Sequence, residues 1–250
     1  RSGSGHEGRT MRRIGIIADV HADVHALRAA LAQIARLGCD LILCAGDVVG
    51  YGLFPEETIA LLRERAVVCV RGNHDRWALG DGSPEDPFAE SSAIPRDASG
   101  WNLSHEARRF LEELPRSWHG LMEEMRVAMV HGTPRSELEG IFPVQMAGHE
   151  LQRCLNLTDA DVLVVGHTHE PFRVVAPGGG VIVNPGILLR RPVEDGEQVV
   201  MVFDTKNGSF VSAVKPTTGT FGVLELPSRR FHVYLAADGT EVEIRRVTKY

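Results

Sequence analysis

Cysteine is scarce in this 250-residue sequence, and its spacing matches no common metal or redox motif. None of Cys39, Cys44, Cys69 and Cys154 forms a C-x-x-C pair. Cys44 and Cys69 lie inside apolar runs, and buried cysteines usually behave as small apolar side chains. We therefore expect free thiols, which fits a reducing compartment and predicts a cytoplasmic location.

Long hydrophobic runs are also absent. The longest, Leu41–Ala45 and Val162–Val165, are far shorter than the ~20 apolar residues of a membrane-spanning helix, so we expect no membrane contact. Residues 1–10 are rich in glycine and serine and lack the apolar centre of a secretion signal. Because a methionine follows at position 11, we expect residues 1–10 to be a remnant of expression cloning.

Positive charge is not in excess. The 27 Lys and Arg residues are outnumbered by 33 Asp and Glu residues, and the net charge is −6. A nucleic-acid-binding domain would usually be basic, so nucleic acid is not expected as a partner. An anionic substrate stays open, because a bound metal ion can reverse the local field. With 43% hydrophobic and 24% charged residues, the composition is that of an ordinary globular protein.

The first 70 residues alternate between short apolar runs and segments with helical spacing. The expected order is strand, helix, strand, helix and strand, over Ile14–Ala18, Val24–Leu37, Leu41–Ala45, Pro55–Arg65 and Val67–Val70. Asp23 is expected to cap the first helix. This alternation predicts an α/β domain with parallel strand pairing.

The middle of the chain continues the alternation after an interruption. Several glycines and prolines predict a long loop over residues 78–100. Helices are then expected over Leu103–Leu114 and near His149–Leu155, and strands over Val127–Val130 and Val162–Val165.

After residue 171 the pattern becomes β-rich. The expected strands are Phe172–Val175, Val181–Val183, Val199–Phe203, Phe210–Val214, Phe221–Leu226, Phe231–Leu235 and Val242–Val247. No composition break marks a second domain. We therefore expect a single domain over residues 11–250, in which a β-rich C-terminal extension (187–250) follows a motif-bearing core (11–186).

Polar residues follow five of the expected strands, at the point where each strand ends. They are Asp19 and His21, Asp47, Asn73 to Asp75, His131, and His167 and His169. Because strand ends of an open α/β sheet meet at one edge, these segments predict a single site. In D-x-H and H-x-H, an extended backbone would place both side chains on the same side.

The residue types indicate a metal site. Carboxylate, imidazole and amide oxygen suit Mn²⁺, Fe, Zn²⁺, Ni²⁺ or Co²⁺, whereas four histidines argue against Ca²⁺ or a lone Mg²⁺. Seven candidate ligands are too many for one tetrahedral ion. They suit two ions that share a carboxylate and lie roughly 3.5–4 Å apart.

The ordered motifs D-x-H, G-D, G-N-H-D, H-G and G-H-T-H resemble those of the calcineurin-like metallophosphoesterase superfamily, and look closest to its small bacterial and archaeal phosphodiesterase branch. Further similarity lies in Gly46–Gly52 before Pro55, Trp101, Leu114-Pro115 and Asn184–Gly186. The resemblance implies two mixed β-sheets packed as a sandwich and flanked by helices (α/β/β/α), here with extra C-terminal β-structure.

The resemblance also implies roles for individual residues. One metal ion would be held by Asp19, His21, Asp47 and His169, and the second by Asp47, Asn73, His131 and His167. Asn73 and His74 would bind the substrate phosphate, His74 would assist the leaving group, and Asp75 would orient His74. The implied activity is hydrolysis of a small phosphoester, most simply a diester, by a hydroxide that bridges two ions, with manganese the first expectation.

Two positions depart from the family pattern, and several residues fit more than one role. Ala22-Asp23 stands where the family often has Gly-Asn, and Ile187 where it has Ser. Asp75 could simply cap a turn. Tyr51, Arg76 and Trp77 could line the substrate cleft or serve in packing. The alternatives are a non-catalytic scaffold, or a phosphomonoesterase, nuclease or protein phosphatase of the superfamily. The C-terminal β-region could mediate homo-oligomer formation.

Overall fold

The computed structural model describes residues 11–81, 103–189, 199–204, 209–214, 219–244 and 246–248. The expected remnant (1–10), Trp101 and most of the expected 78–100 loop lie outside these residues. The first sheet comprises β1 (Arg12–Ile17), β2 (Leu41–Cys44), β3 (Val68–Cys69), β11 (Thr220–Leu226), β12 (Arg230–Leu235) and β13 (Glu241–Val242). Its strand order is β13-β12-β11-β1-β2-β3, with β1, β2 and β3 parallel as expected.

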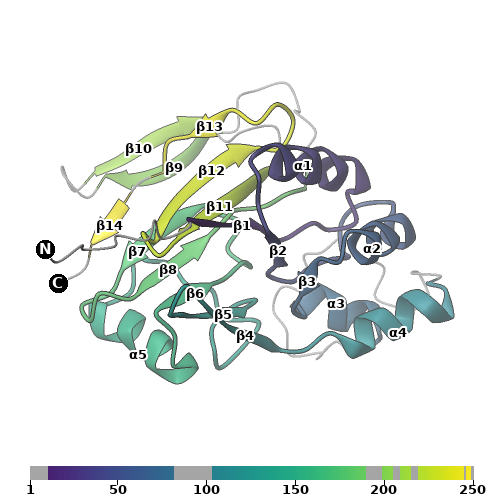
Figure 1. Cartoon of the computed structure of the whole chain (residues 1–250), viewed down its shortest axis with the longest axis horizontal. Helices are drawn as coiled ribbons and strands as arrows, with labels where there is room; N and C mark the ends of the chain where they lie inside the picture. The colour runs from purple at the N-terminus through teal and green to yellow at the C-terminus, as the bar shows by residue number, and fades with distance from the viewer. Residues whose placement is uncertain are drawn as a thin grey trace, which may run out of the picture.

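A second six-stranded sheet packs against the first (Figure 1). Its strands are β4 (Ser117–Met122), β5 (Met125–Val130), β6 (Val162–Val164), β7 (Phe172–Val175), β8 (Val181–Asn184) and β14 (Arg246–Thr248). They are arranged as β14-β7-β8-β6-β5-β4 and include parallel and antiparallel pairs. A separate antiparallel ribbon is formed by β9 (Val199–Asp204) and β10 (Ser209–Val214).

Helices cover the outer faces of the two sheets (Figure 1). They are α1 (Val24–Arg36), α2 (Pro55–Glu64), α3 (Asn73–Ala78), α4 (His105–Glu113) and α5 (Gly148–Thr158). The first four share a hydrophobic cluster with the first sheet, whereas α5 packs on the second sheet. Asp23 caps α1 by accepting a hydrogen bond from the Ala26 backbone N–H at 3.0 Å, as predicted.

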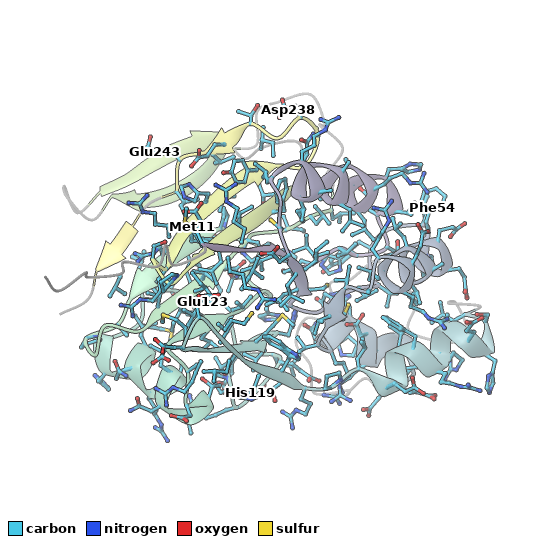
Figure 2. The ribbon with its side chains drawn as sticks, in the orientation of Figure 1. Met11, Phe54, His119, Glu123, Asp238 and Glu243 are labelled. Carbon is cyan, nitrogen blue, oxygen red and sulfur yellow. The ribbon has the colours of Figure 1, made fainter. Side chains whose placement is uncertain are left out.

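The alternation along β1 explains the layering. Ile14 and Ile16 face the second sheet, whereas Ile17 faces the helices. Gly15 also faces α1, where a Cβ atom would come within 2.6 Å of the Ile34 Cγ2 atom. The central strand thus lies between two apolar layers, and Figure 2 shows side chains filling the space on both of its sides. The expected α/β/β/α sandwich is confirmed.

The structure differs from the predicted elements in three places. A short helix, α3, begins at Asn73, and β4 precedes β5 as a hairpin partner; neither was expected. The single strand expected over Val242–Val247 is wrong, because β13 pairs with β12 and β14 pairs with β7 of the other sheet. Hydrophobic alternation cannot show which partner each half of a segment will find.

The C-terminal segments contribute to both sheets. β11 pairs antiparallel with β1, so it occupies the centre of the first sheet. β14 forms the edge of the second sheet beside β7. Strands that follow residue 186 therefore complete the sandwich. Among the helices within the described ranges, none has the length and apolar character needed to cross a membrane.

Candidate metal centre

The polar residues that follow the strands converge at one edge of the sandwich. Asp19 and His21 follow β1, and Asp47 follows β2. The other four come from the start of α3 and from the segments after β5 and β6: Asn73, His131, His167 and His169. Both sheets therefore supply the site, as predicted from the strand ends.

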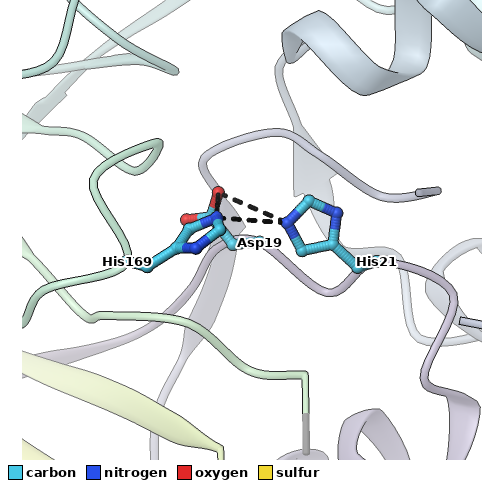
Figure 3. A group of neighbouring side chains, drawn as sticks. All are labelled: Asp19, His21 and His169. Atoms are coloured by element: carbon cyan, nitrogen blue, oxygen red, sulfur yellow. Dashed lines mark hydrogen bonds and ion pairs between the residues drawn. The ribbon is translucent and has the colours of Figure 1, made fainter. Parts of the chain in front are cut away.

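Asp19, His21 and His169 form one group (Figure 3). The His169 Nε2 atom lies 3.4 Å from the Asp19 Oδ1 atom and 3.2 Å from the His21 Nε2 atom. The His21 Nε2 atom is 4.0 Å from the same carboxylate oxygen. Two imidazole nitrogens and a carboxylate oxygen thus point at a common position, which is the arrangement that a divalent cation needs.

Asp47 lies between this group and a second one. Its Oδ2 atom is 3.9 Å from the His21 Nε2 atom and 3.4 Å from the His131 Nε2 atom. Its Oδ1 atom accepts the backbone N–H of His74 at 2.9 Å, which fixes the carboxylate plane. The Asp47 Oδ2 atom thus faces a histidine of each group.

The second group contains Asn73, His131 and His167. The Asn73 Oδ1 atom lies 3.0 Å from the His131 Nε2 atom and 3.1 Å from the His167 Nδ1 atom. The opposite nitrogen of His131 lies 2.7 Å from the Ala45 carbonyl oxygen. This contact requires a proton on Nδ1 and leaves Nε2 available as a ligand atom, as is usual for histidines that bind metals.

The ligand loops have a left-handed backbone, which corrects one sequence argument. Asp19, His21, Asp47, His167 and His169 have φ values of 52°, 48°, 52°, 65° and 61°. The D-x-H and H-x-H side chains therefore converge through turns and not through strand alternation, because β1 and β6 end before these motifs. Each such conformation costs about 1–3 kcal/mol and persists where surrounding contacts enforce it.

Backbone contacts between loops supply that support. The Asp19 N–H donates to the Gly46 carbonyl at 3.1 Å, and the His21 N–H donates to the Asp47 carbonyl at 2.9 Å. Gly72 allows a close approach, since a Cβ atom there would lie 2.1 Å from the Asp47 Oδ1 atom. The positions of the ligands thus depend on direct contact between neighbouring strand ends.

Burial and the neighbouring charges shift the pKa values of the site. Burial alone would raise the pKa of Asp47, but the surrounding histidines, His131 first, hold it well below the usual range. Burial also works against a charged His131, yet the Asp47 carboxylate raises the pKa of this imidazole to about 10. Burial lowers the pKa of His21 to about 3. Buried carboxylates with facing imidazoles form a donor set for a cation.

The donors fit divalent metal ions. Three overlapping sets of potential ligands have their ligand atoms within 4.8 Å of one another: Asp19, His21 and His169; His21, Asp47 and His74; and Asp19, Asp47 and His131. Asp19, His21 and Asp47 each belong to two of these sets. Oxygen and nitrogen donors of this kind suit first-row divalent ions. The chemistry of the donor set thus agrees with the metal site expected from the sequence.

His74 lies beside the ligand groups. Within the described residues, the Asp75 carboxylate makes no hydrogen bond to the His74 imidazole. The His74 Nε2 atom is 4.0 Å from the Asp47 Oδ2 atom, and its Nδ1 atom has no hydrogen-bond partner among the described residues. The Asp75 carboxylate instead accepts the backbone N–H groups of Gly72 at 2.9 Å and Val49 at 3.1 Å. This is the capping role that the sequence left open.

Two residues that support the ligand loops, Asn184 and Glu137, were not assigned this role from the sequence. The Asn184 Nδ2 atom donates to the Gly166 carbonyl at 2.8 Å and to the Thr168 Oγ1 atom at 3.1 Å, and so braces the G-H-T-H loop. The N-P-G motif was the available signal for this role. Glu137, which accepts a hydrogen bond from Arg76 at 2.7 Å, carried no signal.

Comparisons with known proteins identify the family of the chain. Residues 11–208 match the model of the calcineurin-like phosphoesterase superfamily domain. An uncharacterized protein of Methanocaldococcus jannaschii is 32% identical over 175 residues, which cover 69% of this chain and 68% of that protein. A probable metallophosphoesterase of Methanothermobacter thermautotrophicus is 30% identical over 177 residues, covering 69% and 75% of the two chains.

A solved structure supports the same assignment. The crystal structure of a metallophosphoesterase from Sphaerobacter thermophilus is similar to this chain with a TM-score of 0.61 and 25% identity, and the similarity covers 94% of this chain and 90% of the other. The matched fold, the matched sequence and the converging ligand groups agree. The chain belongs to the calcineurin-like phosphoesterase superfamily.

Proposed function

We propose that this protein is a phosphodiesterase that hydrolyses P–O bonds of a small ester with two divalent metal ions. The observation that carries the proposal is the position of Asp47, whose Oδ2 atom faces His21 of one ligand group and His131 of the other. A carboxylate in this position would let two ions share a ligand at the separation of about 3.5–4 Å that two-metal sites have.

We propose that the ligands divide between the two ions as the family resemblance implies. Asp19, His21, Asp47 and His169 would hold one ion, and Asp47, Asn73, His131 and His167 would hold the other. When bound, such ions lower the pKa of a water molecule and offset negative charge on a phosphoryl group. Manganese is the ion that we propose first, because a mixed set of oxygen and imidazole donors accommodates it.

We propose His74 as the residue that donates a proton to the leaving group. It is buried beside Asp47 and is not needed to complete either proposed ligand set. Burial lowers the pKa of His74, whereas a nearby phosphate anion would favour its protonated form. The imidazole would then donate its proton to the departing ester oxygen. Asp75 supports this position indirectly, by holding the backbone at Gly72 and Val49.

The test is turnover of a matched pair of chromogenic esters. Purified protein, freed of metal and reloaded with Mn²⁺, Ni²⁺, Zn²⁺ or Mg²⁺, is assayed with bis(p-nitrophenyl) phosphate and with p-nitrophenyl phosphate. We expect the diester to be hydrolysed faster, with two ions per chain by elemental analysis. Faster hydrolysis of the monoester would make the protein a phosphomonoesterase. Absence of turnover with both ions bound would favour the scaffold alternative.

A further inference from the structure

Two aromatic side chains border His74 without belonging to either ligand group. The Tyr51 ring centroid lies 4.8 Å from that of His74, and the Trp77 ring centroid lies 4.4 Å away. Tyr51 also contacts His21, with a centroid distance of 4.6 Å. An ester whose phosphate lies beside His74 would therefore have its organic group next to these rings.

Tyr51 is held in place by the loop that carries it. The Gly52 N–H donates to the His21 carbonyl at 2.7 Å, and the Phe54 N–H donates to the Ala22 carbonyl at 3.1 Å. At Gly50, a Cβ atom would lie 2.3 Å from the His21 Nδ1 atom, so this loop packs directly on a metal-ligand candidate. The backbone of the loop is thereby tied to the backbone of the D-x-H motif.

The Tyr51 side chain also reaches the surface, where other residues of the same loop expose apolar side chains. Tyr51 is 46% exposed and Leu53 is 84% exposed. Phe54, also exposed, lies at the end of this loop, and its ring contacts His25 with a centroid distance of 5.2 Å. Figure 2 shows Phe54 on the side of the molecule that carries α1 and α2. An anion-binding site with such a border fits a substrate that has an apolar organic part.

Trp77 and Arg76 are less suited to bind that organic part. Trp77 is only partly exposed and packs on His74, so it forms a wall of the site. The Arg76 guanidinium is held by Glu137 and Asp81 through hydrogen bonds of 2.7 Å and 3.1 Å. Of these two described rings beside His74, Tyr51 is the one with substantial exposure.

We infer that Tyr51 is a specificity-determining residue that stacks on a flat aromatic group, aryl or nucleobase, of the substrate ester. This inference rests on the proposed function, because it places the phosphoryl group beside His74. Stacking of an aromatic group on tyrosine is worth about tenfold in affinity, and a saturated ring of the same size gains less.

Binding of phosphonates tests the inference without turnover. Isothermal titration calorimetry of the Mn²⁺-loaded protein compares phenylphosphonate with cyclohexylphosphonate, which share one head group and differ in the ring. We expect phenylphosphonate to bind about tenfold more tightly, Tyr51→Ala to abolish this preference, and Tyr51→Phe to retain it. Leu157→Ala is the matched control, because Leu157 is an exposed apolar side chain of α5, away from this loop, and its loss should leave the preference unchanged.

A further ligand distinguishes a nucleobase from an aryl group as the partner of Tyr51. An adenosine phosphonate that binds more tightly than phenylphosphonate, and loses that advantage in Tyr51→Ala, identifies a nucleobase; the reverse order identifies an aryl group. Equal affinity of the phenyl and cyclohexyl compounds overturns the inference, as does a preference that survives Tyr51→Ala or a failure of both compounds to bind. Ring-dependent binding without ester hydrolysis would leave Tyr51's role standing and refute only the phosphodiesterase proposal.

Discussion

Asp47 combines two roles that would otherwise need separate residues. Its Oδ2 atom faces histidines of both ligand groups, and its Oδ1 atom accepts the backbone N–H of His74. The left-handed conformation at Asp47 is enforced by the contact between the strand ends after β1 and β2. A single buried carboxylate thus connects metal binding to the placement of the proposed acid.

Replacing Asp47 by asparagine should therefore remove metal and activity together. The amide keeps the shape of the side chain but lacks the charge that attracts two cations. We expect elemental analysis of Asp47→Asn to show fewer than one ion per chain, with turnover reduced in parallel. Asp23→Asn is the control, since Asp23 is also buried but caps α1. Retention of two ions by Asp47→Asn would contradict the shared-ligand assignment.

His74 should behave differently, because it completes neither proposed ligand set. His74→Ala is expected to retain both ions and to lower kcat by about 10²–10⁴-fold, the usual contribution of a positioned general acid. The measurement is steady-state kinetics with metal content determined on the same samples. His25→Ala, an exposed histidine outside the motifs, should keep the wild-type rate. An unchanged kcat in His74→Ala would remove the proposed proton donor.

At the scale of elements, the site depends on how α3 is attached to the segment after β5. Glu137 is 8% exposed and accepts a hydrogen bond from Arg76 of α3 at 2.7 Å. The Arg71 Nη2 atom, just before α3, lies 3.7 Å from the same carboxylate. Because Asn73 and His131 lie on these two connected segments, we expect Glu137 to act as a positioning residue for the second ligand group.

Glu137→Ala should destabilise the protein and weaken the second metal site. Loss of a buried carboxylate that pairs with two arginines costs up to about 3–5 kcal/mol, less here because both arginines are partly exposed. Urea unfolding measures the stability, and calorimetric titration with Mn²⁺ measures the two affinities. Glu137→Gln should recover part of both effects, because its amide oxygen can still accept from Arg76.

An exposed ion pair provides the control variant for Glu137→Ala. Asp159 pairs with Arg126 in an exposed cluster away from the ligands, and such exposed pairs contribute about 0–1 kcal/mol. We expect Asp159→Ala to change the free energy of unfolding only slightly and the Mn²⁺ affinities not at all. Equal Mn²⁺ affinities in Glu137→Ala and the wild type would show that Glu137 has no positioning role.

At the scale of the whole molecule, the sequence predicted what depends on local pattern. Runs such as Leu41–Ala45 marked strands, and the polar residues after them marked the site, because strand ends share an edge. The left-handed turns at Asp19 and His167 were not predictable, since they are enforced by contacts with other loops. The division of the last strand between two sheets was equally hidden, because it depends on the partners β12 and β7.

We expect the same assembly to make the global stability of the protein depend on both metal and pH. In the metal-free protein the Asp47 carboxylate raises the pKa of His131 to about 10, against the burial that opposes its charge, from an ordinary value of 6.5. A raised pKa means that the protonated imidazole stabilises the fold. This stabilisation is complete below about pH 6.5 and is lost as the pH rises towards about 10. A metal ion needs the neutral imidazole and therefore competes with this proton.

We accordingly expect the metal-induced increase in Tm to grow with pH. Differential scanning calorimetry at pH 7, 8 and 9, with EDTA or with excess Mn²⁺, should show a metal-free Tm that falls over this range and a difference between the two states that widens. The range begins at pH 7 because burial lowers the pKa of His21 and His74, and below that pH these two groups make stability rise with pH. His119→Gln, which removes an exposed histidine of β4 outside the site, should reproduce this trend. A difference that is constant or shrinks with pH would mean that no ligand proton is displaced on binding. In that case the close contact of 3.4 Å between Asp47 and His131 would have to be a structural ion pair that persists alongside the metal.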